Sequence, residues 1–300
     1  MDDPTLATWE LTEDPQAFLD AAAGVLAEQP VRATIVANTA RRLASHADQG
    51  VPAPDHPSWF AVARDAAGAI AGVAMRTAPA PPHQAHLMPM EPALAESLAD
   101  LLLARGEVVE AANGAQVPAR AFVDRVRERT GGAVVVARPS RLFELGTLTP
   151  PRTPRGAPRL GAADEASLAH RWFGRFHTDA ERQAGRDVTS TVPPLPLDPI
   201  ERRVSAGQLW WWEADGEPVS LVGYVGPALG VARVGPVFTP AEHRGRGFAG
   251  ALVTHVSALL RDAGHRVCLF TDLQNPVSNA LYARLGYEPV VDMAELRIVP

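Results

Sequence analysis

The stretch FTPAEHRGRGFAGALVTHV, residues 238–256, joins a short apolar run to a segment with helical spacing through Arg244, Gly245, Arg246 and Gly247. A helix leaves its first N–H groups unpaired, and its aligned peptide dipoles place about half a positive charge at that end. Glycines let the backbone bend closely around an anion, and arginines add donors that fork onto phosphate oxygens. The stretch therefore predicts a phosphate-binding helix start.

Two other kinds of phosphate loop fit these residues less well. A P-loop needs a lysine, and the sequence contains none. GRGFAG does satisfy the dinucleotide fingerprint, but that motif follows the first strand of a βαβ unit, whereas we expect three strands before it in this domain. Dinucleotide binding is therefore disfavoured.

The second half of the chain alternates helices and strands around this stretch. Helices are expected over 164–176 and 198–207, and a hairpin over 208–225 turns at Asp215-Gly216. The strand VARVGPVF follows, and Pro236 predicts a bulge or an edge within it because proline cannot donate to a ladder. The remaining elements are a helix over 247–263, a strand over 266–272, a helix over 275–286 and a strand over 288–299.

The first half repeats this order. It has helices over 15–29 and 32–46, a hairpin over 58–78 and a helix over 92–106, followed by a further helix and the strand-pair candidates AVVVA and RLFELGTL. The proline-rich segment 147–165 reads as an extended linker between the halves. We therefore predict two domains, 1–150 and 151–300, as an internal tandem repeat.

The motifs in the second half resemble those of the GNAT superfamily of acyl-CoA N-acyltransferases. RGRGFA fits the pyrophosphate motif R-x-x-G-x-A between a bulged strand and a long helix, and NPVSNALYARLGYEP looks like the second signature of that family. The resemblance is specific over roughly residues 205–298 and only architectural over the first half. It implies an α/β fold of two GNAT-like domains, each with a mixed, mostly antiparallel sheet flanked by helices.

The resemblance also implies acetyl-CoA as co-substrate and a set of residues that hold it. The backbone of Val237 and Phe238 would bind the pantetheine arm, and Asn275 and Tyr282 would lie along that arm and near the thioester. The pyrophosphate would be held by Arg244, Gly245, Arg246, Gly247, Phe248 and Ala249.

Direct attack by a neutral amine in a ternary complex needs a polarised carbonyl and a proton for the departing thiolate. The Phe238 N–H is the candidate polarising donor, and Tyr282 is the candidate general acid, with a buried aromatic as the alternative. The general base stays open among Glu213 at the end of a hairpin strand, His177, His243 and a chain of waters.

The acceptor is expected to be a small-molecule or peptide amine. The loop over 181–198 is long enough to cover a cleft. Trp210, Trp211 and Trp212 alternate across a strand, so one face could line an acceptor pocket or pack in the core.

The first half offers a poor phosphate site at the matching helix start. Pro92 lacks an N–H donor, and Glu91 and Glu96 bring negative charge where phosphate would bind. We therefore expect a degenerate domain without the cofactor motif.

Composition limits the remaining possibilities. The net charge of −6 argues against a nucleic-acid partner, and no apolar run reaches the roughly 20 residues of a membrane span. The single cysteine, Cys268, reads as a buried strand residue rather than a nucleophile, and the sequence predicts no metal site. We expect a cytoplasmic protein, monomeric or homodimeric.

Overall fold

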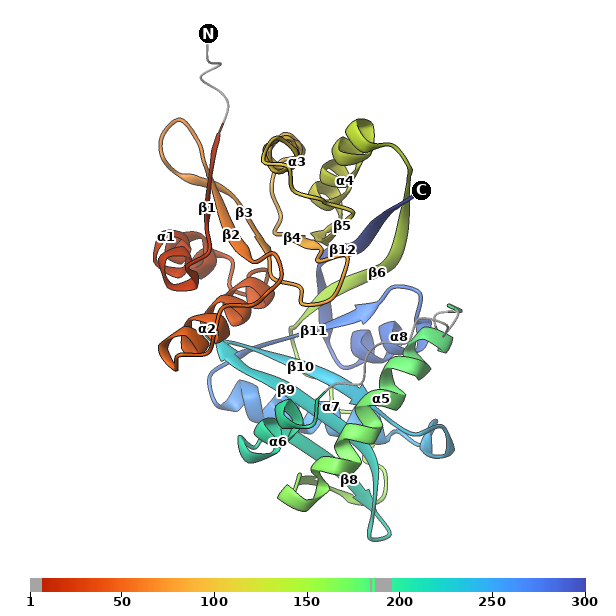
Figure 1. Ribbon diagram of the computed structural model, residues 1–300. Coiled ribbons are helices and arrows are strands. Elements are labelled where there is room, and N and C mark those ends of the chain that lie inside the picture. Colours follow the sequence, from red (N-terminus) through yellow and green to blue (C-terminus); the bar gives the residue numbers. More distant parts are fainter. Residues whose placement is uncertain (1–6, 184, 187–195) are drawn as a thin grey trace. The chain divides into compact units, whose positions relative to one another are not determined.

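The computed structural model describes residues 7–183, 185–186 and 196–300. The chain divides into two compact units, unit 1 with Met1–Ser140 and Val291–Pro300, and unit 2 with Arg141–Val290. These differ from the predicted halves. Unit 2 begins earlier than residue 151, and the last residues of the chain belong to unit 1. Figure 1 follows the chain in colour through both units.

Unit 1 opens with a strand and two helices, followed by alternating strands and helices. Its elements are β1 (Thr8–Thr12), α1 (Pro15–Glu28), α2 (Thr34–Asp48), β2 (Trp59–Arg64), β3 (Ile70–Arg76), β4 (Ala85–Leu87), α3 (Pro92–Ala104), β5 (Ala111–Ala115), α4 (Gln116–Thr130) and the first part of β6 (Ala133–Leu145).

The sheet of unit 1 runs in the order β1-β2-β3-β4-β5-β12, where β12 is Tyr287–Val299. All these neighbours pair antiparallel except β4 and β5, which pair parallel because α3 crosses between them. Leucines of α3 and the buried Phe122 and Val126 of α4 pack together against the strands.

Unit 2 repeats the same order of elements. They are β7 (Ala157–Leu160), a short 3₁₀ turn, α5 (Ala166–Gln183), α6 (Asp198–Ser205), β8 (Leu209–Ala214), β9 (Glu217–Ala228), β10 (Val231–Phe238), α7 (Phe248–Asp262), β11 (Arg266–Asp272), α8 (Pro276–Arg284) and the start of β12.

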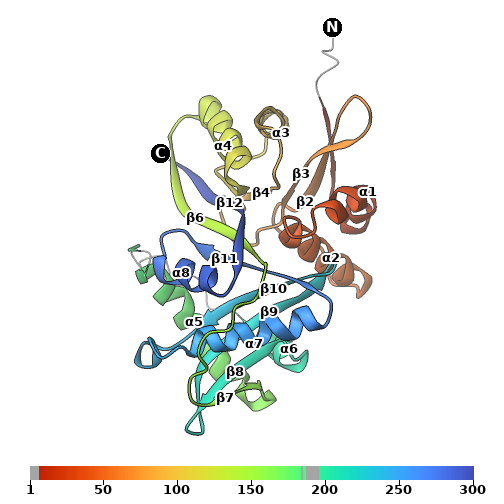
Figure 2. The same cartoon turned by 180° about the vertical axis from the view of Figure 1, so that it is seen from behind.

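The strands of unit 2 lie in the order β11-β10-β9-β8-β7, and again one pair, β10 and β11, is parallel. The helices α5 and α6 cover one face of these strands and α7 the other, as opposite views show (Figures 1 and 2). Two apolar clusters fill the layers, one against α7 and α8 and one against α5 and α6.

The segment predicted as a linker contains a strand. β7 pairs antiparallel with β8, from Ala157↔Glu213 to Leu160↔Trp210. Pro158 lies within β7, which stands last in the order of strands, and an edge strand tolerates a residue that cannot donate to a ladder. The prolines therefore mark an edge rather than a break between domains.

The strand pair expected at the end of the first half is instead one strand. AVVVA and RLFEL form the continuous β6, which contains Pro139 close to the boundary between the units at Ser140. The last strand also serves both units, because Met293 to Arg297 of β12 pair with β5 of unit 1.

Candidate active site

The strands β10 and β11 stop pairing part-way along their length. Their described parallel register ends at Val234↔Leu269. β10 then shifts register against β9 between Val234 and Val237, at Pro236, which confirms the predicted bulge. Val237 and Phe238 therefore lie beyond the last pair that β10 forms with β11.

A cavity of about 430 Å³ lies at this end of β10 in unit 2. Its walls come from the end of β10, the segment before α7 with the first turn of that helix, α8 with the residue before it, and the last turns of α5. From the predicted cofactor set, the lining contains Val237, Phe238, Arg244, Gly245, Gly247, Phe248, Ala249, Asn275 and Tyr282. Arg246 is exposed and does not line it.

The start of α7 is shaped to receive an anion. Gly247 is its N-cap residue with a φ of +84°, and no side chain caps the helix. The N–H groups ahead of Ala251, which bonds to the Gly247 carbonyl, therefore have no helical acceptor. A Cβ built at Gly245 or Gly247 would meet nothing within 4 Å, so the space in front of this backbone is open.

Arg244 is an exposed residue that lines this cavity. Its Nε donates to the Thr239 carbonyl at 2.9 Å and its Nη2 to Asp179 at 2.6 Å. Within the described residues its Nη1 has no partner. The contacts hold the guanidinium in place and leave one amino group for a ligand.

Asn275 and Tyr282 place two polar side chains on the α8 side. Asn275 caps α8 by accepting from the Ser278 N–H at 3.1 Å, and its Nδ2 donates to Gln183 at 2.9 Å. Tyr282 is 7% exposed, and burial raises the pKa of its phenol well above the usual value. Tyr282 therefore keeps its proton throughout the neutral range.

The structure does not bring Glu213 to the cavity. Its carboxylate pairs with Arg159 at 2.5 Å, and Arg159 also pairs with Glu165. Arg159 belongs to β7, which lies within the predicted linker, so this ion pair could not be predicted from the sequence. Glu213 as a general base is thus not supported by its position.

The two histidines considered as bases lie differently. His243 lines the cavity, and its buried Nδ1 has no hydrogen-bond partner in the described part of the chain. It directly precedes Arg244, on the side expected to hold phosphate. His177 packs against the Phe176 ring at 5.3 Å and is not a lining residue.

Sequence reasoning missed the contribution of α5. Phe176, Asp179 and Gln183 line the cavity at positions i, i+3 and i+7, which share one helix face. The prediction ended this helix at residue 176, whereas α5 continues to Gln183. Of the loop 181–198, residues 184 and 187–195 lie outside the described residues.

The tryptophans of β8 pack in the core. Trp211 is fully buried and meets Trp172 edge-on at 5.0 Å in the cluster against α5 and α6. Trp212 faces the opposite cluster, against α7. Core packing therefore accounts for both side chains. Cys268 is buried in β11, as expected.

The family comparison agrees with this geometry. The model of the Acetyltransferase (GNAT) family matches residues 170–287, a range that includes every residue lining the cavity. Residues 170–287 form a GNAT acetyltransferase domain. This domain is of the acyltransferase class.

Solved structures extend the likeness to the whole fold. The chain is similar to a GCN5-related N-acetyltransferase from Sphaerobacter thermophilus, with 14% identity, a TM-score of 0.57, and coverage of 99% of this chain and 96% of that one. A Drosophila protein is similar with 13% identity, a TM-score of 0.59 and 99% coverage of both chains. The full chain thus shares the mixed α/β fold of these proteins.

Three further searches found no match or site. A search among curated proteins returned no sequence match. In the described ranges no group of three or more His, Cys, Asp or Glu side chains could hold a metal ion. The helices described are all too short or too polar to cross a bilayer.

Proposed function

We propose that the GNAT domain transfers an acetyl group from acetyl-CoA to a primary amine of a small molecule or peptide, by direct attack in a ternary complex. The observation that carries this proposal is the uncapped, left-handed start of α7, open toward the cavity beside the bulge of β10. Anions bind at such helix starts because free N–H groups and the helix dipole act together.

The donor would be held along this cavity. The pyrophosphate would accept hydrogen bonds from the N–H groups of Phe248 and Ala249 and from Arg244. The pantetheine arm would lie along the backbone of Val237 and Phe238, toward Asn275 and Tyr282 at the other wall.

The transfer then consists of one attack on the thioester, cleavage of its C–S bond and two proton transfers. The amine nitrogen forms a bond to the thioester carbon while the carbonyl oxygen accepts from the Phe238 N–H. The C–S bond breaks, and the sulfur takes the phenolic proton of Tyr282. Burial raises the pKa of this phenol, so the proton leaves only as negative charge builds on the sulfur, and Tyr282 takes a proton back from water after each turnover. The amine loses its surplus proton to water.

A second function is favoured by one observation. Among the described lining residues the single carboxylate is Asp179, and Arg244 holds it at 2.6 Å, so no free carboxylate can act as base there. A protein that binds acyl-CoA without turning it over, as a sensor or interaction module, would need no such base in its cavity.

Donor binding is tested by calorimetry with acetyl-CoA. Arg244→Glu should weaken binding about tenfold or more, because it removes a charge-assisted donor and adds a like charge beside phosphate. Arg261→Glu makes the same change in net charge at the exposed end of α7 and should leave binding unchanged. Equal affinity of Arg244→Glu and the parent protein would remove the proposed site. We expect one acetyl-CoA per chain.

Turnover is tested by thiol release over a panel of amines. Activity that is present in the parent protein and reduced at least a hundredfold in Tyr282→Phe supports transfer with Tyr282 as acid. Tight binding of acetyl-CoA without release on any amine supports the sensor.

A further inference from the structure

Two arginines lie on the α5 and α6 side of the sheet in unit 2. Arg203 of α6 donates from Nη1 to the Gly235 carbonyl at 3.3 Å, so its guanidinium lies beside β10. A Cβ at Gly223 of β9 would be only 3.5 Å from the same Nη1. Arg233 of β10 lies two residues before Gly235, and both arginines are half-buried.

Neither of these two arginines forms an ion pair with an acidic residue in the described part of the chain. Arg203 stacks over the Phe173 ring at 5.7 Å, and Arg233 over the Phe270 ring at 5.7 Å. Burial lowers the pKa of both guanidinium groups, and the charge of Arg233 lowers that of Arg203 further. Uncompensated positive charge of this kind is costly, since half-buried charges are normally paired.

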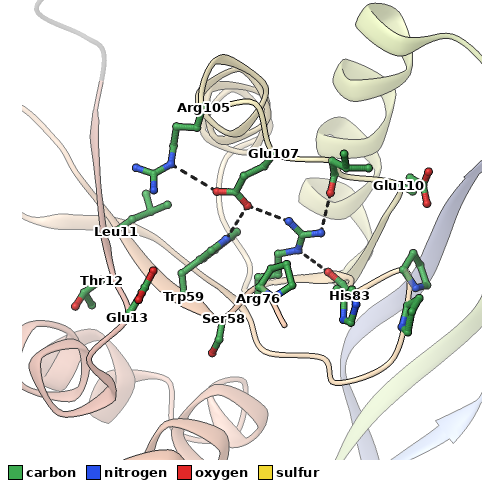
Figure 3. A pocket seen from close by; sticks show the side chains of 14 residues that line it. Leu11, Thr12, Glu13, Ser58, Trp59, Arg76, His83, Arg105, Glu107 and Glu110 are labelled. Atoms are coloured by element: carbon green, nitrogen blue, oxygen red, sulfur yellow. Dashed lines mark hydrogen bonds and ion pairs between the residues drawn. The ribbon is translucent and has the colours of Figure 1, made fainter. Parts of the chain in front are cut away.

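Another buried arginine of the protein shows the usual solution. Arg76 of unit 1 donates to Glu107 at 2.9 Å and to the carbonyls of His83 and Val108 at 2.7 Å each, and Trp59 also donates to Glu107 (Figure 3). Its side chain is 4% exposed, at a cavity of about 610 Å³. Here a carboxylate neutralises the guanidinium, and among the described residues neither Arg203 nor Arg233 has such a partner.

We infer that Arg203 and Arg233 bind an anionic group of the acceptor. Two guanidinium groups suit a carboxylate or a phosphate, which they bind through paired N–H donors. The inference rests on the proposed transfer at Phe238. The side chain of Phe238 belongs to the apolar cluster against α5 and α6, and it therefore faces the same side of the sheet as the two arginines. The acceptor is thus an amine that also carries negative charge.

The strand sets the spacing between the two ends of the acceptor. Gly235, beside the Arg203 guanidinium, lies three residues before Phe238, and a strand advances about 3.3 Å per residue. Because the bulge at Pro236 shortens this stretch, the reacting nitrogen and the anionic group are separated by at most roughly 10 Å. An α-amino acid is too short to span this distance, whereas a tripeptide or a long-chain ω-amino acid can do so.

The experiment compares straight-chain amines with and without a terminal anion. The panel is ω-aminobutanoate, ω-aminohexanoate and ω-aminooctanoate, each against the alkylamine of the same length, together with ω-aminohexyl phosphate. We expect KM for ω-aminooctanoate to be about tenfold or more below that of octylamine, and no such difference for the shortest pair. The phosphate arm shows which anion is preferred.

Variants assign the effect to the arginines. Arg203→Met and Arg233→Met should remove the preference by raising KM for the amino acid, with kcat and acetyl-CoA affinity unchanged. Arg202→Met, on the exposed face of α6, is the matched control and should preserve it. Thermal unfolding checks that each variant folds, and Arg203→Lys, which keeps the charge, should retain part of the preference.

Two outcomes are separable. If amines are acetylated but length and charge have no effect, or if both variants act on acid and amine alike, the inference is overturned while the proposed function stands. If no amine is turned over, calorimetry of ω-aminooctanoate against the CoA-saturated protein decides. Binding that disappears in Arg233→Met supports the anion site, and absence of binding overturns it.

Discussion

Replacing Gly247 by alanine separates the two roles of this residue, backbone conformation and ligand space. The residue has a φ of +84°, and a Cβ there would meet no protein atom within 4 Å. The cost to folding is therefore backbone strain alone, about 1 kcal/mol. In a domain of this size that lowers the melting temperature by roughly 2–4 °C. The same Cβ would occupy the space in which phosphate oxygens must approach the N–H groups of α7.

The expected loss of affinity is larger than the loss of stability. Displacing a phosphate oxygen from one charge-assisted hydrogen bond costs about 1.5–3 kcal/mol, which is roughly a ten- to hundredfold increase in the acetyl-CoA dissociation constant. Calorimetry on the folded variant measures it, at a temperature well below its melting point.

Gly216 supplies the matched control. It has a φ of +81° in the β8–β9 hairpin turn, and a Cβ there would also meet nothing within 4 Å. Gly216→Ala should therefore lower the melting temperature by a similar amount and leave acetyl-CoA binding unchanged. If Gly247→Ala binds acetyl-CoA as well as Gly216→Ala does, the start of α7 is not the phosphate site.

Three further predictions concern stability. Burial raises the pKa of Tyr282 above its unfolded value of about 10, so the stability that the protonated phenol contributes is fully present below pH 10 and is lost as pH rises further. Denaturant titrations should therefore show a smaller loss of unfolding free energy at alkaline pH in Tyr282→Phe than in the parent protein, and an equal loss would contradict this. Asn275→Ala should lower the free energy of unfolding by about 1 kcal/mol through loss of the α8 cap, and Asn275→Ser should lower it much less; equal unfolding midpoints for the two variants would exclude the capping role. Both variants should weaken acetyl-CoA binding if the amide contacts the donor. Deleting Val291–Pro300 should strip hydrogen-exchange protection from Ala111–Ala115 of unit 1 and leave that of β9 intact, and the reverse pattern would support the division at residue 150.

Features written in a few neighbouring residues could be predicted from the sequence. The Asp215-Gly216 pair has φ values of +54° and +81°, as a tight hairpin turn requires. Pro236 marks the register shift of β10, and the glycines before α7 are left-handed. In each case the chemistry of one or two residues fixes the local backbone, so a local pattern suffices.

Features that depend on distant partners could not be predicted. Nothing within 147–165 reveals that β8 offers a free edge to Ala157–Leu160, and so the ion pair between Arg159 and Glu213 was also hidden. The pairing of β12 with β5 likewise joins segments from opposite ends of the chain. The lack of an ion pair at Arg203 among the described residues is of the same kind, because it depends on where acidic residues from other parts of the chain lie.

The two halves show that the fold and the phosphate site make separate demands on the same helix. α3 and α7 both connect a parallel pair of strands, and both bury an apolar face, with Leu98 and Leu102 in one and Leu252 in the other. Their first turns differ, because α3 begins at Pro92 after an extended Glu91. The proline removes a donor and the carboxylate repels phosphate, yet neither disturbs the buried face. A domain can therefore lose the phosphate site in its first helical turn while its sheet and core persist, which is how we account for a repeat with one proposed acetyl-CoA site.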